Sequence, residues 1–329
     1  MTKPLLAALE MRPMPHPPVW IMRQAGRYLP EYQELRDRHS FQEVVSTPKL
    51  AAEITLQPIH RFGMDGAVIF ADIMTPLEAL GVDMTFDPGP KLRPLSLEQV
   101  AALPELDPGK VEHVAETIRI VKDEVPSQTA VIGFAGAPTT LLAYLLEGGG
   151  SKDFMTMRSA LRSRPVLAAE ALGKLSRSMS AYLAVQAEAG ADVVQLFDTW
   201  AGLLDPEGYE RFAIPAARQS LAGLGVPTIY FAPGAGHVLG VQPKIGATGY
   251  GVDWRTPIGE AFATIDGHPI QGNLDPAVLL SGVETIRDEV RRVRDEVGDR
   301  GGHIMNLGHG IDRRTPPENV AAFVAATRS

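Results

Sequence analysis

Residues 131–140 read VIGFAGAPTT, an apolar run that ends in glycine, alanine and proline and is followed by two threonines. The first five positions are apolar or glycine and do not alternate with polar residues. Such a run is typical of a strand that is buried on both faces, as strands of a parallel sheet are. The stretch therefore predicts a buried strand over Val131–Ala135, with the hydroxyl groups of Thr139 and Thr140 just beyond its end.

Six further runs along the chain have the same apolar character. Together with the first, the predicted strands are Ala67–Ala71, Val131–Ala135, Val193–Phe197, Thr228–Phe231, Tyr250–Trp254, Ile270–Asn273 and Ile304–Leu307. Amphipathic stretches predict helices between them, namely Lys49–Arg61, Val111–Glu124, Arg164–Ala189, Glu207–Leu224 and Val283–Val297. An eighth strand fits into Asp83–Leu95, around Pro88-Gly89-Pro90.

The alternation of strands and helices predicts an α/β protein with a parallel sheet. With eight such units and no break in composition, we expect one domain over residues 1–329, a single-domain (β/α)8 TIM barrel. A doubly wound sheet is the alternative. The proline-rich segment from Pro13 to Pro18 predicts an extended N-terminal arm.

The composition excludes several classes of function. The chain has no cysteine, which excludes disulfides, thiolate nucleophiles and cysteine-ligated zinc or iron–sulfur sites. A net charge of −8 argues against nucleic acid or an anionic membrane as a partner. No apolar run approaches the ~20 residues that span a bilayer, and the apolar stretch near the start is too short for a signal peptide. We expect a cytoplasmic protein.

The segment from Pro17 to Pro30 contains two arginines four residues apart, Arg23 and Arg27, beside Gly26. Arginine binds carboxylate or phosphate through two parallel hydrogen bonds and keeps its charge near neutral pH. We interpret this segment as an anion clamp. Polar residues also follow the ends of five predicted strands, where barrel enzymes place their chemistry; they are Asp72, Thr139, Thr140, Asp198, Thr199, Asn273, Asp275 and His309.

Two other patterns carry less weight. The glycines of Gly234–Gly240, with Asp253 downstream, are similar to a dinucleotide-binding fingerprint, but they occur late in the series of strands rather than in its first unit. His303 and His309 lack the paired spacing of a metal motif. We therefore expect neither a nucleotide nor a metal.

Several segments resemble the uroporphyrinogen decarboxylase family, in order, from about residue 17 to the C-terminus. Besides the clamp they are Phe70–Ile73, Gly133–Thr140, Tyr144, Glu147–Ser151, Gln195–Gly202, Val252–Trp254, Gln271–Pro276 and Asn306–Gly310. The resemblance implies a cofactor-free (β/α)8 barrel that forms a homodimer. It also implies an enzyme of haem biosynthesis that removes CO2 from the four acetate side chains of uroporphyrinogen III to give coproporphyrinogen III.

The resemblance also implies roles for individual residues. Arg23 and Arg27 hold the substrate, with Arg36 a third arginine; Asp72 binds the pyrroles; Tyr144, Thr199 and His309 complete the site. From the residues alone other roles stay open. Asp72 could cap the following helix, Tyr144 could be a core residue, and Thr199 could be a turn residue. His309 could be a core histidine, and Arg36 could belong to a solvated helix face.

The chemistry agrees with these roles. Loss of CO2 leaves a carbanion that needs an electron sink, and no motif for pyridoxal phosphate or thiamine diphosphate is present. A protonated pyrrole can be that sink, and the Asp72 carboxylate would stabilise the resulting cation. Arginine is a poor acid, so the proton donor stays open. The alternatives are a non-catalytic tetrapyrrole carrier and a related zinc-dependent methyltransferase, which the absence of cysteine disfavours.

Overall fold

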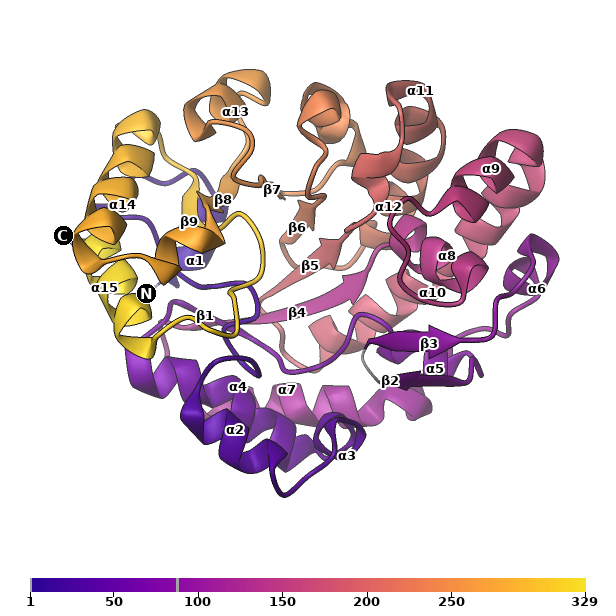
Figure 1. Ribbon diagram of the computed structural model, residues 1–329, viewed down its shortest axis with the longest axis horizontal. Helices are drawn as coiled ribbons and strands as arrows, with labels where there is room; N and C mark the ends of the chain where they lie inside the picture. The colour runs from indigo at the N-terminus through magenta and orange to yellow at the C-terminus, as the bar shows by residue number, and fades with distance from the viewer. Residues whose placement is uncertain (1, 87–88) are drawn as a thin grey trace.

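The computed structural model describes residues 2–86 and 89–329 as a curled parallel sheet surrounded by helices (Figure 1). Adjacent strands of the sheet are all parallel. In spatial order they are β1 (Gly66–Val68), β4 (Ala130–Gly136), β5 (Val193–Phe197), β6 (Thr228–Phe231), β7 (Gly249–Gly251), β8 (Ile270–Leu274) and β9 (His303–Leu307). Each overlaps one of the seven predicted strands, and nearly every residue in them is buried. The α/β prediction is confirmed, with a TIM-barrel-like arrangement of the sheet.

The segment Pro18–Trp20 lies between the two edge strands, β1 and β9. Val19 forms a parallel bridge with Met305 of β9, and the backbone N–H of Trp20 donates to the Met305 carbonyl at 3.3 Å. On the other side, the N–H of Asp65, one residue before β1, donates to the Val19 carbonyl at 2.8 Å. A short piece of the N-terminal region therefore connects the first and last strands of the sheet.

The eighth strand predicted within Asp83–Leu95 was wrong. This region forms a separate antiparallel pair, β2 (Met84–Phe86) and β3 (Pro90–Leu92); Pro88, at the centre of the predicted strand, lies outside the described residues. Proline lacks the N–H that a central strand must donate to its neighbour, so a segment with three prolines is poorly suited to the inside of a sheet. Val19, which is fully buried, takes that place instead.

Helices cover the outer side of the sheet (Figure 1). The longer ones are α4 (Pro48–Phe62), α7 (Glu112–Glu124), α8 (Pro138–Glu147), α9 (Met155–Ser163), α10 (Pro165–Glu188), α12 (Ile214–Leu221), α14 (Val283–Val297) and α15 (Pro317–Arg328). The shorter ones are α1 (Pro4–Leu9), α2 (Pro30–Arg36), α3 (Phe41–Ser46), α5 (Thr75–Ala79), α6 (Leu97–Ala101), α11 (Pro206–Gly208) and α13 (Ile258–Thr264). Helical turns occur at Pro108–Val111, Ala201–Leu203, Tyr209–Ala213, Gly236–Ile245 and Pro276–Leu280. None of the helices in the described ranges is long and apolar enough to cross a bilayer.

The helix predicted over Glu207–Leu224 is interrupted. It consists of α11, a π-type turn at Tyr209–Ala213 and α12. Pro215 lies in the first turn of α12 and has no N–H. It therefore cannot donate the backbone hydrogen bond that would continue a helix from the preceding turn. The other predicted helices match α4, α7, α10 and α14 to within one residue at each end.

Candidate active site

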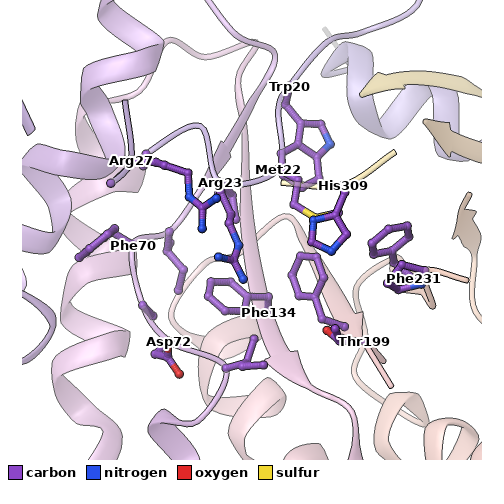
Figure 2. A pocket seen from close by; sticks show the side chains of 18 of the residues that line it. Trp20, Met22, Arg23, Arg27, Phe70, Asp72, Phe134, Thr199, Phe231 and His309 are labelled. Atoms are coloured by element: carbon purple, nitrogen blue, oxygen red, sulfur yellow. The ribbon is translucent and has the colours of Figure 1, made fainter. Parts of the chain in front are cut away.

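A cavity of about 300 Å3 lies at the carboxyl ends of the strands. Parallel strands bring their ends together, so residues that follow β1, β5 and β9 meet here with the loop that follows Trp20 (Figure 2). The cavity is lined by Trp20, Met22, Arg23, Ala25, Gly26, Arg27, Phe41, Val68, Ile69, Phe70, Ala71, Asp72, Ile73, Phe134, Phe197, Thr199, Phe231, Pro233 and His309.

The two clamp arginines differ in their surroundings. Arg23 has a left-handed backbone with φ of 63°, and its side chain extends into the cavity with Asp72 on one side and His309 on another (Figure 2). Arg27 is half-buried and donates from Nη1 to the Ile311 carbonyl at 3.1 Å. Burial, followed by repulsion from Arg23, lowers the pKa of Arg27. Two adjacent cations of this kind favour a ligand that carries several negative charges.

Gly26 lets the clamp loop approach the strand that leads to Asp72. Its φ is +77°, and a Cβ atom at this position would lie 2.1 Å from Cε2 of Phe70. Any other residue would therefore be strained in its backbone and would displace the Phe70 ring. The glycine holds the arginine loop against the wall of the cavity.

Asp72 follows β1 and is mostly enclosed by protein. Its Oδ1 accepts a hydrogen bond from the N–H of Met74 at 2.8 Å. Burial raises the pKa of Asp72, while the Met74 N–H and the charge of Arg23 act in the opposite direction. The capping alternative was wrong, because the N-cap of α5 is Met74 and no side chain caps this helix; Asp72 supports only the turn before it. The residue also lines the cavity, where a carboxylate can face a cationic group.

His309 follows β9 and presents a neutral imidazole. Its Nδ1 accepts a hydrogen bond from the N–H of Gly310 at 2.8 Å, which leaves the proton on Nε2. Burial lowers the pKa of His309, and the charges of Arg23, Arg27 and Arg255 lower it further. The ring can therefore donate one hydrogen bond into the cavity without adding a charge.

Thr199 lies on a turn that is held in place by hydrogen bonds of the preceding residue, Asp198. The buried Asp198 carboxylate accepts hydrogen bonds from Thr140 Oγ1 at 2.8 Å and from the Tyr230 hydroxyl at 2.9 Å. The same Thr140 oxygen accepts the N–H of Trp200 at 3.1 Å. Burial raises the pKa of Asp198 to about 6. This network fixes both sides of Thr199, whose position at the cavity is thereby set.

Comparison with known proteins identifies the family. The family model described as uroporphyrinogen decarboxylase (URO-D) matches residues 1–329. The chain belongs to the uroporphyrinogen decarboxylase family. It is 45% identical to the uroporphyrinogen decarboxylase of Thermus thermophilus over 97% of this chain and 96% of that protein. It is 44% identical to that of Syntrophotalea carbinolica over 95% of this chain and 93% of that protein.

Solved structures of proteins with other names show the same fold. A methyltransferase from Methanosarcina mazei superposes with a TM-score of 0.83 at 21% identity, covering 98% of this chain and 96% of that one. A B12-independent methionine synthase from Shewanella superposes with a TM-score of 0.59 at 12% identity, covering 94% and 95%. At these identities the likeness shows the fold alone.

Two residues that the uroporphyrinogen decarboxylase resemblance implies lie away from the cavity lining. Tyr144 is on α8, with its ring 6.1 Å from that of Trp200; burial raises its pKa, and Asp72 and Arg23 act on it from nearby. Arg36, at the end of α2, donates to the His39 carbonyl, and its guanidinium lies 5.9 Å from the Phe41 ring. Tyr144 therefore borders the site through Trp200, and Arg36 contacts Phe41, which lines the cavity.

The sequence interpretation missed an aromatic surface in the uroporphyrinogen decarboxylase cavity. Phe134, Phe197 and Phe231 come from the ends of β4, β5 and β6 and line the cavity. Their rings meet edge to face, at 5.6 Å between the first two and 6.3 Å between the last two. The sequence did indicate this surface, because each of the three phenylalanines lies at the end of a predicted strand or within two residues of it. Such a surface suits the apolar face of a macrocycle.

The described residues contain no group of three or more histidine, aspartate or glutamate side chains that could hold a metal ion. The dinucleotide-like glycines have a structural use: the N–H of Gly234 donates to Oδ2 of Asp253, which also pairs with Arg255 at 2.8 Å. Asp253 thereby holds two loops together.

Proposed function

We propose that this protein is a uroporphyrinogen decarboxylase that converts uroporphyrinogen III to coproporphyrinogen III and CO2 in haem biosynthesis. The family and its full-length relatives support this activity. The observation that carries the proposal is that one cavity combines Arg23 and Arg27 with the enclosed carboxylate of Asp72. A substrate with a pyrrole core and a rim of carboxylates needs both.

In the proposed reaction the pyrrole supplies its own electron sink. A proton adds to the ring carbon that bears the acetate and gives a cation. The bond to the carboxylate then breaks, CO2 leaves, and the bonding electrons neutralise the ring. A second proton on the new exocyclic carbon and loss of the first from the ring leave a methyl group. Asp72 stabilises the cationic stage electrostatically, and it can also accept hydrogen bonds from pyrrole N–H groups.

The other residues bind the substrate in this proposal. Arg23 and Arg27 orient carboxylates and the water near them, because arginine is too weak an acid to supply the proton itself. Thr199 and the Nε2–H of His309 donate single hydrogen bonds to the substrate rim. Tyr144 at the border of the cavity, and Arg36 beyond Phe41, contact its outer side chains. No cofactor takes part.

We further propose that residues 1–329 form one domain, a (β/α)8 barrel with an extended N-terminal arm, and that it acts as a homodimer in the cytoplasm. The placement of Pro18–Trp20 between β1 and β9 supports a barrel. The resemblance to the uroporphyrinogen decarboxylase family supports the homodimer. Light scattering of the purified protein tests the dimer.

The activity is tested by anaerobic incubation of the purified, metal-stripped protein with uroporphyrinogen III. Products are oxidised and separated by carboxylate number. We expect hepta- to tetracarboxylate porphyrins without any added cofactor. If the octacarboxylate persists while the folded protein binds it, the chain is a tetrapyrrole carrier and not an enzyme.

A further inference from the structure

Two loops at the cavity are joined to each other by backbone and side-chain hydrogen bonds. We call residues 20–28 the arginine loop and residues 306–312 the histidine loop. The N–H of Ile311 donates to the Met22 carbonyl at 3.0 Å, and Arg27 donates to the Ile311 carbonyl. The backbone next to Arg23 is thereby tied to the loop that carries His309.

Asn306 makes the most buried of these connections. It is fully buried in β9, and its Oδ1 accepts the N–H of Met22 at 2.9 Å and the N–H of Leu307 at 2.8 Å. Its Nδ2 is buried without a hydrogen-bond partner among the described residues. An unsatisfied buried donor costs stability, so packing alone would favour an apolar residue here. The presence of an amide here indicates that the side-chain oxygen is needed to accept the N–H of Met22.

Arg23 depends on this support because its own guanidinium forms no hydrogen bond or ion pair with the described part of the chain. Its backbone is in the left-handed region, which costs a non-glycine residue free energy unless its neighbours hold it there. Its side-chain stem rests on Gly310, where a Cβ atom would lie 2.6 Å from Cδ and 3.0 Å from Cγ of Arg23. The histidine loop thus fixes both the backbone and the stem of Arg23.

We propose that Asn306 and Gly310 are positioning residues for Arg23. Asn306 fixes the backbone that precedes Arg23, and the bare surface of Gly310 sets the direction in which its guanidinium enters the cavity. Neither residue needs to touch the substrate. The inference rests on the proposed function, in which Arg23 binds a substrate carboxylate.

The first experiment compares Asn306→Ala with a matched control, Asn319→Ala. Asn319 is also buried and makes two hydrogen bonds, to the Leu279 and Ser281 carbonyls at 2.9 Å, and none of these residues lines the cavity. We expect both variants to lose thermal stability. Only Asn306→Ala should weaken binding of the oxidised octacarboxylate, uroporphyrin III, and raise KM for uroporphyrinogen III, each by about tenfold. Equal binding by the two variants would overturn the role of Asn306.

The second experiment is a double-mutant cycle between Gly310→Ala and Arg23→Ala. Gly310→Ala alone should push the Arg23 stem aside and weaken porphyrin binding. In the Arg23→Ala background the atoms that would clash are gone, so Gly310→Ala should have no further effect. Additive losses would refute the proposal. Porphyrin binding does not require turnover, so this result stands apart from the activity: a wild-type protein that binds but does not decarboxylate contradicts the proposed function and not this inference.

Discussion

Asp72→Asn removes the charge of the proposed cation-stabilising group and keeps its shape. The hydrogen bond from the Met74 N–H to Oδ1 can be kept by the asparagine oxygen. The fold and the turn into α5 should therefore survive. The variant separates the electrostatic role of Asp72 from its structural one.

The size of the effect follows from the distance at which a carboxylate can approach a pyrrole cation. At ~4 Å and an effective dielectric constant of ~20, the attraction is ~4 kcal/mol. The ring spreads its charge and the cavity is open, so we take ~2 kcal/mol as the lower bound. Since each ~1.4 kcal/mol changes a rate tenfold, kcat should fall by roughly 30-fold to 1,000-fold.

The assay is the anaerobic decarboxylation of uroporphyrinogen III, with kcat and KM from initial rates and porphyrin binding measured separately. Asp107→Asn is the matched control, because Asp107 accepts the N–H of Gly109 at 2.9 Å in the same kind of turn but is exposed and does not line the cavity. We expect the control to be as active as the wild type. A near-normal kcat for Asp72→Asn would refute the electrostatic role.

Three further predictions concern the clamp, the hydroxyl group and pH. Arg23→Ala and Arg27→Ala should each lower kcat/KM by about 10-fold to 100-fold, the usual loss for a charged hydrogen bond; unchanged values for both would exclude the clamp. Thr199→Ser should keep activity, whereas Thr199→Val should raise KM by up to about tenfold. A wild-type KM for the valine variant would mean that Thr199 has only a structural role in the turn. Burial lowers the pKa of His303 from 6.5 to about 4. Between these pH values the unfolded chain binds more protons than the folded protein, so the free energy of unfolding should fall as pH drops from 6.5 toward 4. His303→Gln should lack this part of the pH dependence in urea denaturation, and identical slopes would contradict the assignment.

The seven strands of the curled parallel sheet could be predicted because each is an apolar run buried on both faces. The closing segment at Val19 could not, since a single bridged residue has no periodicity to detect. Prolines within residues 83–95 were compatible with a short hairpin, which the strand prediction did not consider. The interruption of the predicted helix before α12 follows from Pro215, which is visible in the sequence.

Residue type singled out Arg23, Asp72 and His309, which the structure brings to one cavity, and their roles there stay predictions. The site was not predicted where it depends on the absence or burial of a side chain. The two proposed positioning residues are of this kind: Gly310 leaves room for the Arg23 stem, and one oxygen of Asn306 accepts a backbone N–H from a distant segment. Such pairings span most of the chain and leave no local pattern.

The bridge between Val19 and Met305 has a consequence for how the protein is made. The two partners are separated by nearly the whole chain, so the segment that leads into Arg23 cannot reach its final neighbours until the last strand has left the ribosome. Contacts of such high sequence separation form late and slow folding. During synthesis the edge of β1 beside this segment is unpaired and prone to wrong association. Catalytic competence in this architecture should therefore appear only after β9 has been synthesised and has paired with Val19.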